Sequence, residues 1–117
     1  MAARQKLMQQ NATANDVDMF LTFGTDNLIY EDPVVNVKIE GRDQIRKGML
    51  AFLGASRNAR IAVTKRIAAA NVVVLEQVVS FEEKQPDNRW KPRSRRQITI
   101  FEFEGFKIRR IADYWSR

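Results

Sequence analysis

Helical periodicity fills the first half of the sequence and strand periodicity fills the second, and this order constrains the fold more than any other feature. Apolar residues recur at helical spacing from Asp16 to Gly24 and again from Asp43 to Gly54, and a short polar segment over residues 5–10 also suits a helix. We expect Asp16 and Asp43 to be N-caps, because their carboxylates can accept hydrogen bonds from the first backbone N–H groups. The two glycines are expected to end their helices.

The strand predictions come from alternating or β-branched runs, which cover residues 28–32, 35–39, 60–67, 72–81, 97–103 and 107–115. Pro33 should end the first ladder, because proline has no N–H to donate. Helices followed by a meander of antiparallel strands predict a single α+β domain over residues 1–117, in which a curved sheet wraps the helices.

The turn at Gly105 decides which residues of the last hairpin share a face. A three-residue Phe103-Glu104-Gly105 turn places odd-numbered residues opposite odd-numbered ones, with Asp113 opposite Arg95 and on the same face as Thr99. A two-residue Glu104-Gly105 turn would instead put Asp113 on the other face. The sequence favours the three-residue turn.

The absence of both histidine and cysteine narrows the chemistry. Proton transfer has to use carboxylates, Tyr or Lys, and metal sites or nucleophiles built on His or Cys are excluded. Neither an apolar run long enough to cross a membrane nor a signal-peptide pattern is present, so a cytoplasmic protein is expected.

Positive charge is concentrated in one predicted hairpin. The segment 84–96 holds six basic residues and one acid, which accounts for most of the net charge of +6. With Trp90 inside it, this run would suit a patch that binds single-stranded nucleic acid. The favoured interpretation is a solvated hairpin whose charges deter edge-to-edge pairing. In a third interpretation, Arg95 lies at the mouth of a pocket and selects an anionic ligand.

Tyr30 and Asp32 are the first candidates for a site. They share strand parity, so both are expected to face one apolar cavity, with Asp32 as a general base and Tyr30 as the group that orients it. The alternative is an Asp-Pro pair that only ends a strand. Asp113 is the second candidate acid. Its alternative role is structural, as the partner of Arg95 in a cross-strand ion pair.

The order of motifs resembles the NTF2-like superfamily, and within it the ketosteroid isomerase-like and SnoaL-like polyketide cyclase branch. The resemblance rests on Tyr30-Glu31-Asp32-Pro33, Gly41-Arg42-Asp43-Gln44-Ile45-Arg46 and Ile111-Ala112-Asp113-Tyr114-Trp115. It implies a cone-shaped barrel with N-terminal helices packed on a curved, mostly antiparallel sheet, and one deep apolar pocket. It also implies a homodimer formed through the outer face of the sheet. The expected ligand is small and apolar or weakly polar, with no metal and no cofactor.

Carried over position by position, the resemblance gives a mixed result. Asp32 matches the general base of ketosteroid isomerase, but Met8 and Thr99 stand where that enzyme has its two oxyanion donors. Loss of such donors lowers rates by about 10²–10³ each, which disfavours steroid isomerisation. Tyr30, Asp32 and Asp113 match positions of limonene epoxide hydrolase, whose Arg-x-Asp pair is missing here. Asp113 also matches the base of the cyclases, but their usual histidine partner has no counterpart in this chain.

The resemblance further implies a pocket lining, whose members would otherwise be plain core: Met8, Thr99, Phe101, Ile111 and Trp115. The leading hypothesis is a small-molecule-binding isomerase, cyclase or lyase with Asp32 as base, Tyr30 as its hydrogen-bond donor and Asp113 as an auxiliary acid. The alternative is a non-catalytic ligand-binding or dimerisation module. Nucleic-acid binding through the basic hairpin is disfavoured.

Overall fold

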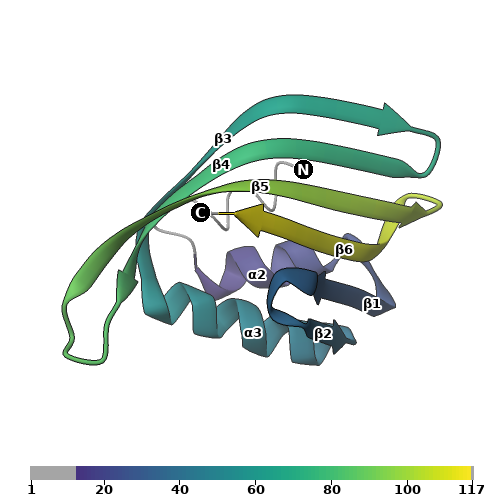
Figure 1. The fold of residues 1–117 in the computed structure, drawn as a ribbon. Helices are drawn as coiled ribbons and strands as arrows, with labels where there is room; N and C mark the ends of the chain where they lie inside the picture. The colour runs from purple at the N-terminus through teal and green to yellow at the C-terminus, as the bar shows by residue number, and fades with distance from the viewer. Residues whose placement is uncertain (1–12, 117) are drawn as a thin grey trace.

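The computed structural model describes residues 13–116, and its elements follow the predicted order of helices and then strands (Figure 1). The predicted helix over residues 5–10 lies outside the described residues. The elements are α2 (Ala14–Leu21), β1 (Gly24–Asp32), the 3₁₀ turn η1 (Pro33–Val35), β2 (Val37–Glu40), α3 (Arg42–Ala55), β3 (Ser56–Ala69), β4 (Val72–Lys84), β5 (Trp90–Glu104) and β6 (Lys107–Ser116).

All the strands belong to one six-stranded sheet with the order β2-β1-β6-β5-β4-β3. Every neighbouring pair is antiparallel except β1 and β6, which run parallel and bring the first strand beside the last. The sheet curves strongly, and α2 and α3 lie within its concave side (Figure 1). This is the α+β architecture that the sequence predicts, with helices against a curved, mostly antiparallel sheet.

The N-caps of both helices lie two or three residues earlier than expected. Thr13, not Asp16, is the N-cap of α2; its hydroxyl accepts from the backbone N–H of Asp16, and the Asp16 carboxylate accepts from the N–H of Thr13. Asp43 lies in the first turn of α3, after a cap at Gly41, whose φ of 90° suits glycine. Gly54 lies inside α3, which ends at Ala55.

The helices bury their apolar stripes against the concave face of the sheet. The buried cluster there contains Val17, Phe20, Leu21, Leu28, Ile45, Leu75, Phe101, Ile108 and Ile111. Burial of these side chains removes apolar surface from water, which is the main contribution to the stability of such a fold. A smaller cluster around Val79 and Phe81 extends toward the far end of α3, where Phe81 and Phe52 meet edge to face.

The turn between β5 and β6 differs from the prediction, although the predicted face is right. Glu104 pairs with Lys107, so Gly105 and Phe106 form a two-residue turn, with glycine at φ 61° in the first central position. A bulge follows, because Phe103 pairs with Ile108 and the next pair joins Glu102 to Arg110. The bulge shifts the register by one residue and so restores the pairing of odd with odd.

As a result, Asp113 lies opposite Thr99 and not opposite Arg95. The expected cross-strand ion pair between Arg95 and Asp113 is therefore replaced by a different set of contacts around each residue.

Candidate functional site

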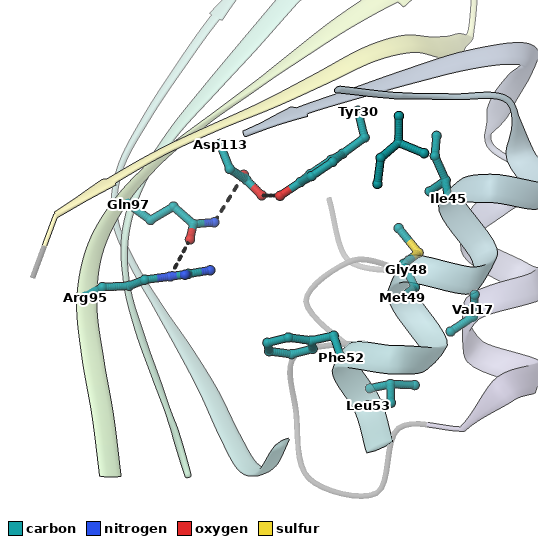
Figure 2. A pocket seen from close by; sticks show the side chains of 11 residues that line it. Val17, Tyr30, Ile45, Gly48, Met49, Phe52, Leu53, Arg95, Gln97 and Asp113 are labelled. Atoms are coloured by element: carbon teal, nitrogen blue, oxygen red, sulfur yellow. Dashed lines mark hydrogen bonds between the residues drawn. The ribbon is translucent and has the colours of Figure 1, made fainter. Parts of the chain in front are cut away.

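A cavity of about 180 Å³ lies between α3 and the concave face of the sheet (Figure 2). Its lining is mostly apolar, and the polar groups converge on it from the sheet. The lining residues are Val17, Tyr30, Ile39, Ile45, Gly48, Met49, Phe52, Leu53, Arg95, Gln97 and Asp113. An apolar hollow with a few convergent polar groups is the usual form of a small-molecule site.

Tyr30 and Asp113 form the central polar contact of this cavity. The Tyr30 hydroxyl donates to Oδ2 of Asp113 at 2.8 Å (Figure 2). The parallel pairing of β1 with β6 places Tyr30 beside Ile111, two residues from Asp113 on the same face. Asp113 is 1% exposed, so its carboxylate is held inside the protein.

Uncharged donors from β5 also bond to Asp113. Thr99 Oγ1 donates to Asp113 Oδ1 at 2.7 Å, and Gln97 Nε2 donates to the same oxygen at 3.1 Å. Behind them, Gln77 on β4 donates from Nε2 to Thr99 Oγ1 at 2.8 Å. All of these side chains are buried, and hydrogen bonding of this kind keeps a buried polar network stable. We call Gln77, Gln97, Thr99 and Asp113 the inner network.

Sequence reasoning gave Gln77 and Gln97 no role in this site. The signal that identifies Gln77 is strand parity, because its alternate neighbours Leu75 and Val79 are buried and apolar. Gln97 shares a face with the buried Thr99 and Phe101 of its own strand. A polar residue in such a position has to find a buried partner.

Arg95 reaches the cavity from β5, the strand that also carries Gln97 and Thr99. Its Nε donates to Oε1 of Gln97 at 3.1 Å, which connects the guanidinium to the inner network. The guanidinium also lies over two aromatic rings, 4.8 Å from the centroid of Trp115 and 5.8 Å from that of Phe81.

Asp32, the predicted general base, lies elsewhere. Both of its carboxylate oxygens accept from the indole Nε1 of Trp115 at 3.0 Å, and it is not among the residues that line the cavity. The hydrogen bond that we expected Tyr30 to give to Asp32 goes to Asp113 instead. The shared strand parity of Tyr30 and Asp32 did not bring them into one lining, because β1 ends at Asp32.

The other predicted lining residues, Thr99, Phe101, Ile111 and Trp115, are not among the described residues that line the cavity. Thr99 lies behind Asp113, Phe101 and Ile111 are packed in the core cluster, and Trp115 stacks with Arg95. Met8 lies outside the described residues. The apolar wall comes mainly from α3, through Ile45, Met49, Phe52 and Leu53.

Two side chains of the basic hairpin, Arg93 and Trp90, have partners on β4 and β3. Arg93 pairs with Glu83 at 3.2 Å, and the guanidinium of Arg57 on β3 lies 4.3 Å from the centroid of the Trp90 ring. Trp90 thus already has a stacking partner, which favours the interpretation of a solvated hairpin over a nucleic-acid patch.

Two further features bear on function within residues 13–116. No group of three or more Asp and Glu side chains is placed to hold a metal ion in this part of the chain. None of the helices that the structure describes has the length and apolar character to cross a membrane.

This architecture, helices packed on a curved, mostly antiparallel six-stranded sheet, is that of the NTF2-like α+β proteins. The sequence matches the model of the SnoaL-like domain over residues 5–111, so the chain belongs to that family. No curated protein matches the sequence.

Several solved structures share the fold. A protein with a ketosteroid isomerase-like fold from Catenulispora acidiphila DSM 44928, in complex with trimethylamine, is 22% identical with a TM-score of 0.80, over 98% of this chain and 83% of that one. A protein assigned as a SnoaL-like polyketide cyclase from Shewanella putrefaciens CN-32 is 13% identical with a TM-score of 0.80, over 97% and 75%. An LEH-like epoxide hydrolase from M. tuberculosis is 19% identical with a TM-score of 0.72, over 98% and 80%. At these identities the likeness concerns the fold alone.

Proposed function

We propose that the chain binds a small, mostly apolar molecule in this cavity and moves a proton on it, with Asp113 as the acid–base group and Tyr30 as the residue that orients it. The observation that carries this proposal is the 2.8 Å hydrogen bond between Tyr30 and Asp113 on the wall of an apolar cavity of about 180 Å³. A carboxylate fixed by hydrogen bonds beside an apolar hollow is arranged as a general base needs to be.

The proposed step needs no co-reactant. The Asp113 carboxylate takes a proton from a carbon next to a carbonyl, and the electron pair of that C–H bond moves toward the carbonyl oxygen to give an enolate. Return of the proton to a different carbon gives an isomer. Attack of the enolate carbon on a second carbonyl of the same molecule gives a cyclised product, and loss of a group from the neighbouring carbon gives elimination. An isomerase, a cyclase or a lyase therefore shares the same first step.

Asp32 remains the competing candidate for the base, on the strength of the family resemblance. The two acids differ in their surroundings, since Asp113 lines the cavity whereas Asp32 holds the Trp115 indole. Substituting each carboxylate by its amide isostere therefore separates the two proposals while the volume at each position is kept.

The test starts with ligands that bind, found by native mass spectrometry of the purified protein and by NMR with a panel of small ketones. Exchange of the α-protons of a bound ketone in D₂O then reports proton abstraction without any need to know the product. We expect Asp113→Asn to slow this exchange by about 10²–10⁴ and Asp32→Asn to change it by only a few-fold. The reverse pattern would assign the base to Asp32.

The alternative, a non-catalytic ligand-binding module, is supported by the number of hydrogen bonds around Asp113. Tyr30, Gln97 and Thr99 all donate to it, and such a network can serve to shape a binding wall without chemistry. Binding of ketones with no exchange above the rate in buffer would favour this module over the enzyme.

We also propose a cytoplasmic homodimer that pairs through the outer face of the sheet. In support, several apolar side chains point outward along the central strands, and Ile98 and Tyr114 are paired across β5 and β6 with 43% and 42% exposure. Light scattering of the wild type and of a Tyr114→Lys variant tests the assembly, and a monomeric wild type would contradict it.

A further inference from the structure

Arg95 brings to the cavity a guanidinium that forms no ion pair within residues 13–116 and whose link to the Asp113 carboxylate runs through the Gln97 amide. It belongs to the cavity lining. Within residues 13–116, its one hydrogen bond is the contact from Nε to Gln97, and it takes part in no ion pair. The two terminal nitrogens, Nη1 and Nη2, therefore have no acceptor among these residues.

The other arginines of the sheet are either ion-paired or, as with Arg60, Arg66 and Arg96, exposed to solvent. Arg93, two residues away on β5, pairs with Glu83 at 3.2 Å, and Arg57 pairs with Glu82 at 3.1 Å. Arg110 on the outer face pairs with Glu31 at 3.2 Å. The charge of each of these ion-paired arginines is matched by the protein, whereas that of Arg95 faces the cavity.

The orientation of Arg95 is fixed on several sides. Gln97 holds Nε, and the rings of Trp115 and Phe81 lie against the guanidinium. Trp115 is itself held by Asp32 through its indole N–H. Figure 2 shows Arg95 extending from β5 into the space between Gln97 and Phe52. A guanidinium held in this way presents its terminal N–H groups as a fork that fits a carboxylate.

We infer that the ligand of this cavity is a small carboxylic acid, whose carboxylate pairs with Arg95 and whose apolar body lies against α3. The inference deepens the proposed function, because it uses the same cavity. Apolar side chains of α3, Ile45, Met49, Phe52 and Leu53, would surround the body of the ligand. The volume of about 180 Å³ compares with the roughly 150 Å³ of a cavity that holds benzene, so the body is about the size of one ring.

The test compares acids with their uncharged amides of nearly equal shape. Benzoate, phenylacetate and hexanoate are titrated into the full chain beside benzamide, phenylacetamide and hexanamide, with affinities measured by NMR or calorimetry at low salt. We expect at least one acid to bind ten-fold or more tightly than its amide, as a charged hydrogen-bonded pair in a sheltered site allows. Arg95→Gln should remove this preference while binding of the amide is kept.

Arg93→Gln is the matched control, because Arg93 lies on the same strand with its charge paired to Glu83 and outside the cavity lining. It should keep the preference for the acid. Equal affinities of acid and amide in the wild type would overturn the ligand class but leave the cavity as a binding site. Absence of binding by every acid and amide would overturn the inference, and the ketone experiments then decide the proposed function separately. The wild-type comparison decides the question even if Arg95→Gln does not fold.

Discussion

Two clusters of polar residues occupy opposite faces of the same three strands, β1, β6 and β5, and they are stabilised in different ways. On the outer face, Arg110 of β6 bonds to both Glu31 and Glu102, so that opposite charges neutralise one another. On the inner face, Asp113 is held by a phenol, an amide and a hydroxyl, and the nearby Arg95 has no carboxylate partner within residues 13–116. The outer cluster is complete in itself, whereas the inner one keeps a cationic group directed at a cavity.

This difference indicates which face can bind a ligand. The ion pairs of the outer face stabilise the protein only slightly, and their charged groups are already bonded to one another. A buried carboxylate held by neutral donors, with a guanidinium nearby that forms no ion pair, is a more costly arrangement, which proteins keep mainly where a site requires it. The comparison predicts a clear ranking of substitution effects on the two faces.

Asp113→Ala should have the largest effect on stability. It leaves Tyr30, Gln97 and Thr99 without their common acceptor in a buried site, and we expect a loss of about 2–4 kcal/mol in the free energy of unfolding. Urea denaturation measures this loss, as a lower midpoint of the unfolding transition with an unchanged m-value. Asp113→Asn is the control, since its amide oxygen retains an acceptor, and it should destabilise less. A loss no greater than that of Glu31→Ala would break the proposed contrast between the faces.

How far sequence reasoning succeeds also differs between these regions. The helical stripes and the six strands follow from local periodicity, so the α+β architecture and the position of α3 were predictable. The contact between Tyr30 and Asp113 was not, because it depends on β1 lying parallel to β6, and no local pattern reveals which distant strands become neighbours.

The register of β5 and β6 shows the same limit. The turn has two residues where three were predicted, and the sequence does not reveal the bulge at Arg109. Each difference by itself would put Asp113 on the other face, so the two together leave it on its predicted face. Asp32 shows the reverse case. Its strand parity was argued correctly, but parity at the last residue of a strand does not specify which partner the side chain meets, and here that partner is Trp115.

A smaller effect is expected on the outer face, and it depends on pH. Hydrogen bonding to Arg110 holds the pKa of Glu31 below its ordinary value of 4.5. A carboxylate with a lowered pKa in the folded state adds stability above its unfolded pKa and loses it as the pH falls through the folded value. Glu31→Gln should therefore lower stability at pH 7 by no more than about 1 kcal/mol, as for other partly exposed pairs.

The gap between Glu31→Gln and the wild type should close as the pH falls below about 4.5. Thermal unfolding at pH 7, 5 and 3 measures this convergence. The pKa values of Asp18 and Glu82 are also lowered, by hydrogen bonds to Arg46 and to Asn58 and Arg57, so acid weakens both chains for reasons unrelated to Glu31. Only the difference between the two proteins isolates the pair, and a difference that grew on acidification would contradict the assigned sign.

The smallest effect on stability is expected for Arg95→Met, and its contrast with Arg110→Met sharpens the comparison. Methionine retains most of the apolar stem of the arginine side chain and removes a half-buried charge that has no ion-pair partner among residues 13–116. The free energy of unfolding should therefore change by no more than about 0.5 kcal/mol in either direction. Arg110→Met loses its bonds to Glu31 and Glu102 and should destabilise by about 1 kcal/mol. Parallel denaturation of the two variants measures the difference. If Arg95→Met were the more damaging of the two, the stacking of Arg95 on Trp115 and Phe81 would be a structural support, and its charge would not need a ligand to explain it.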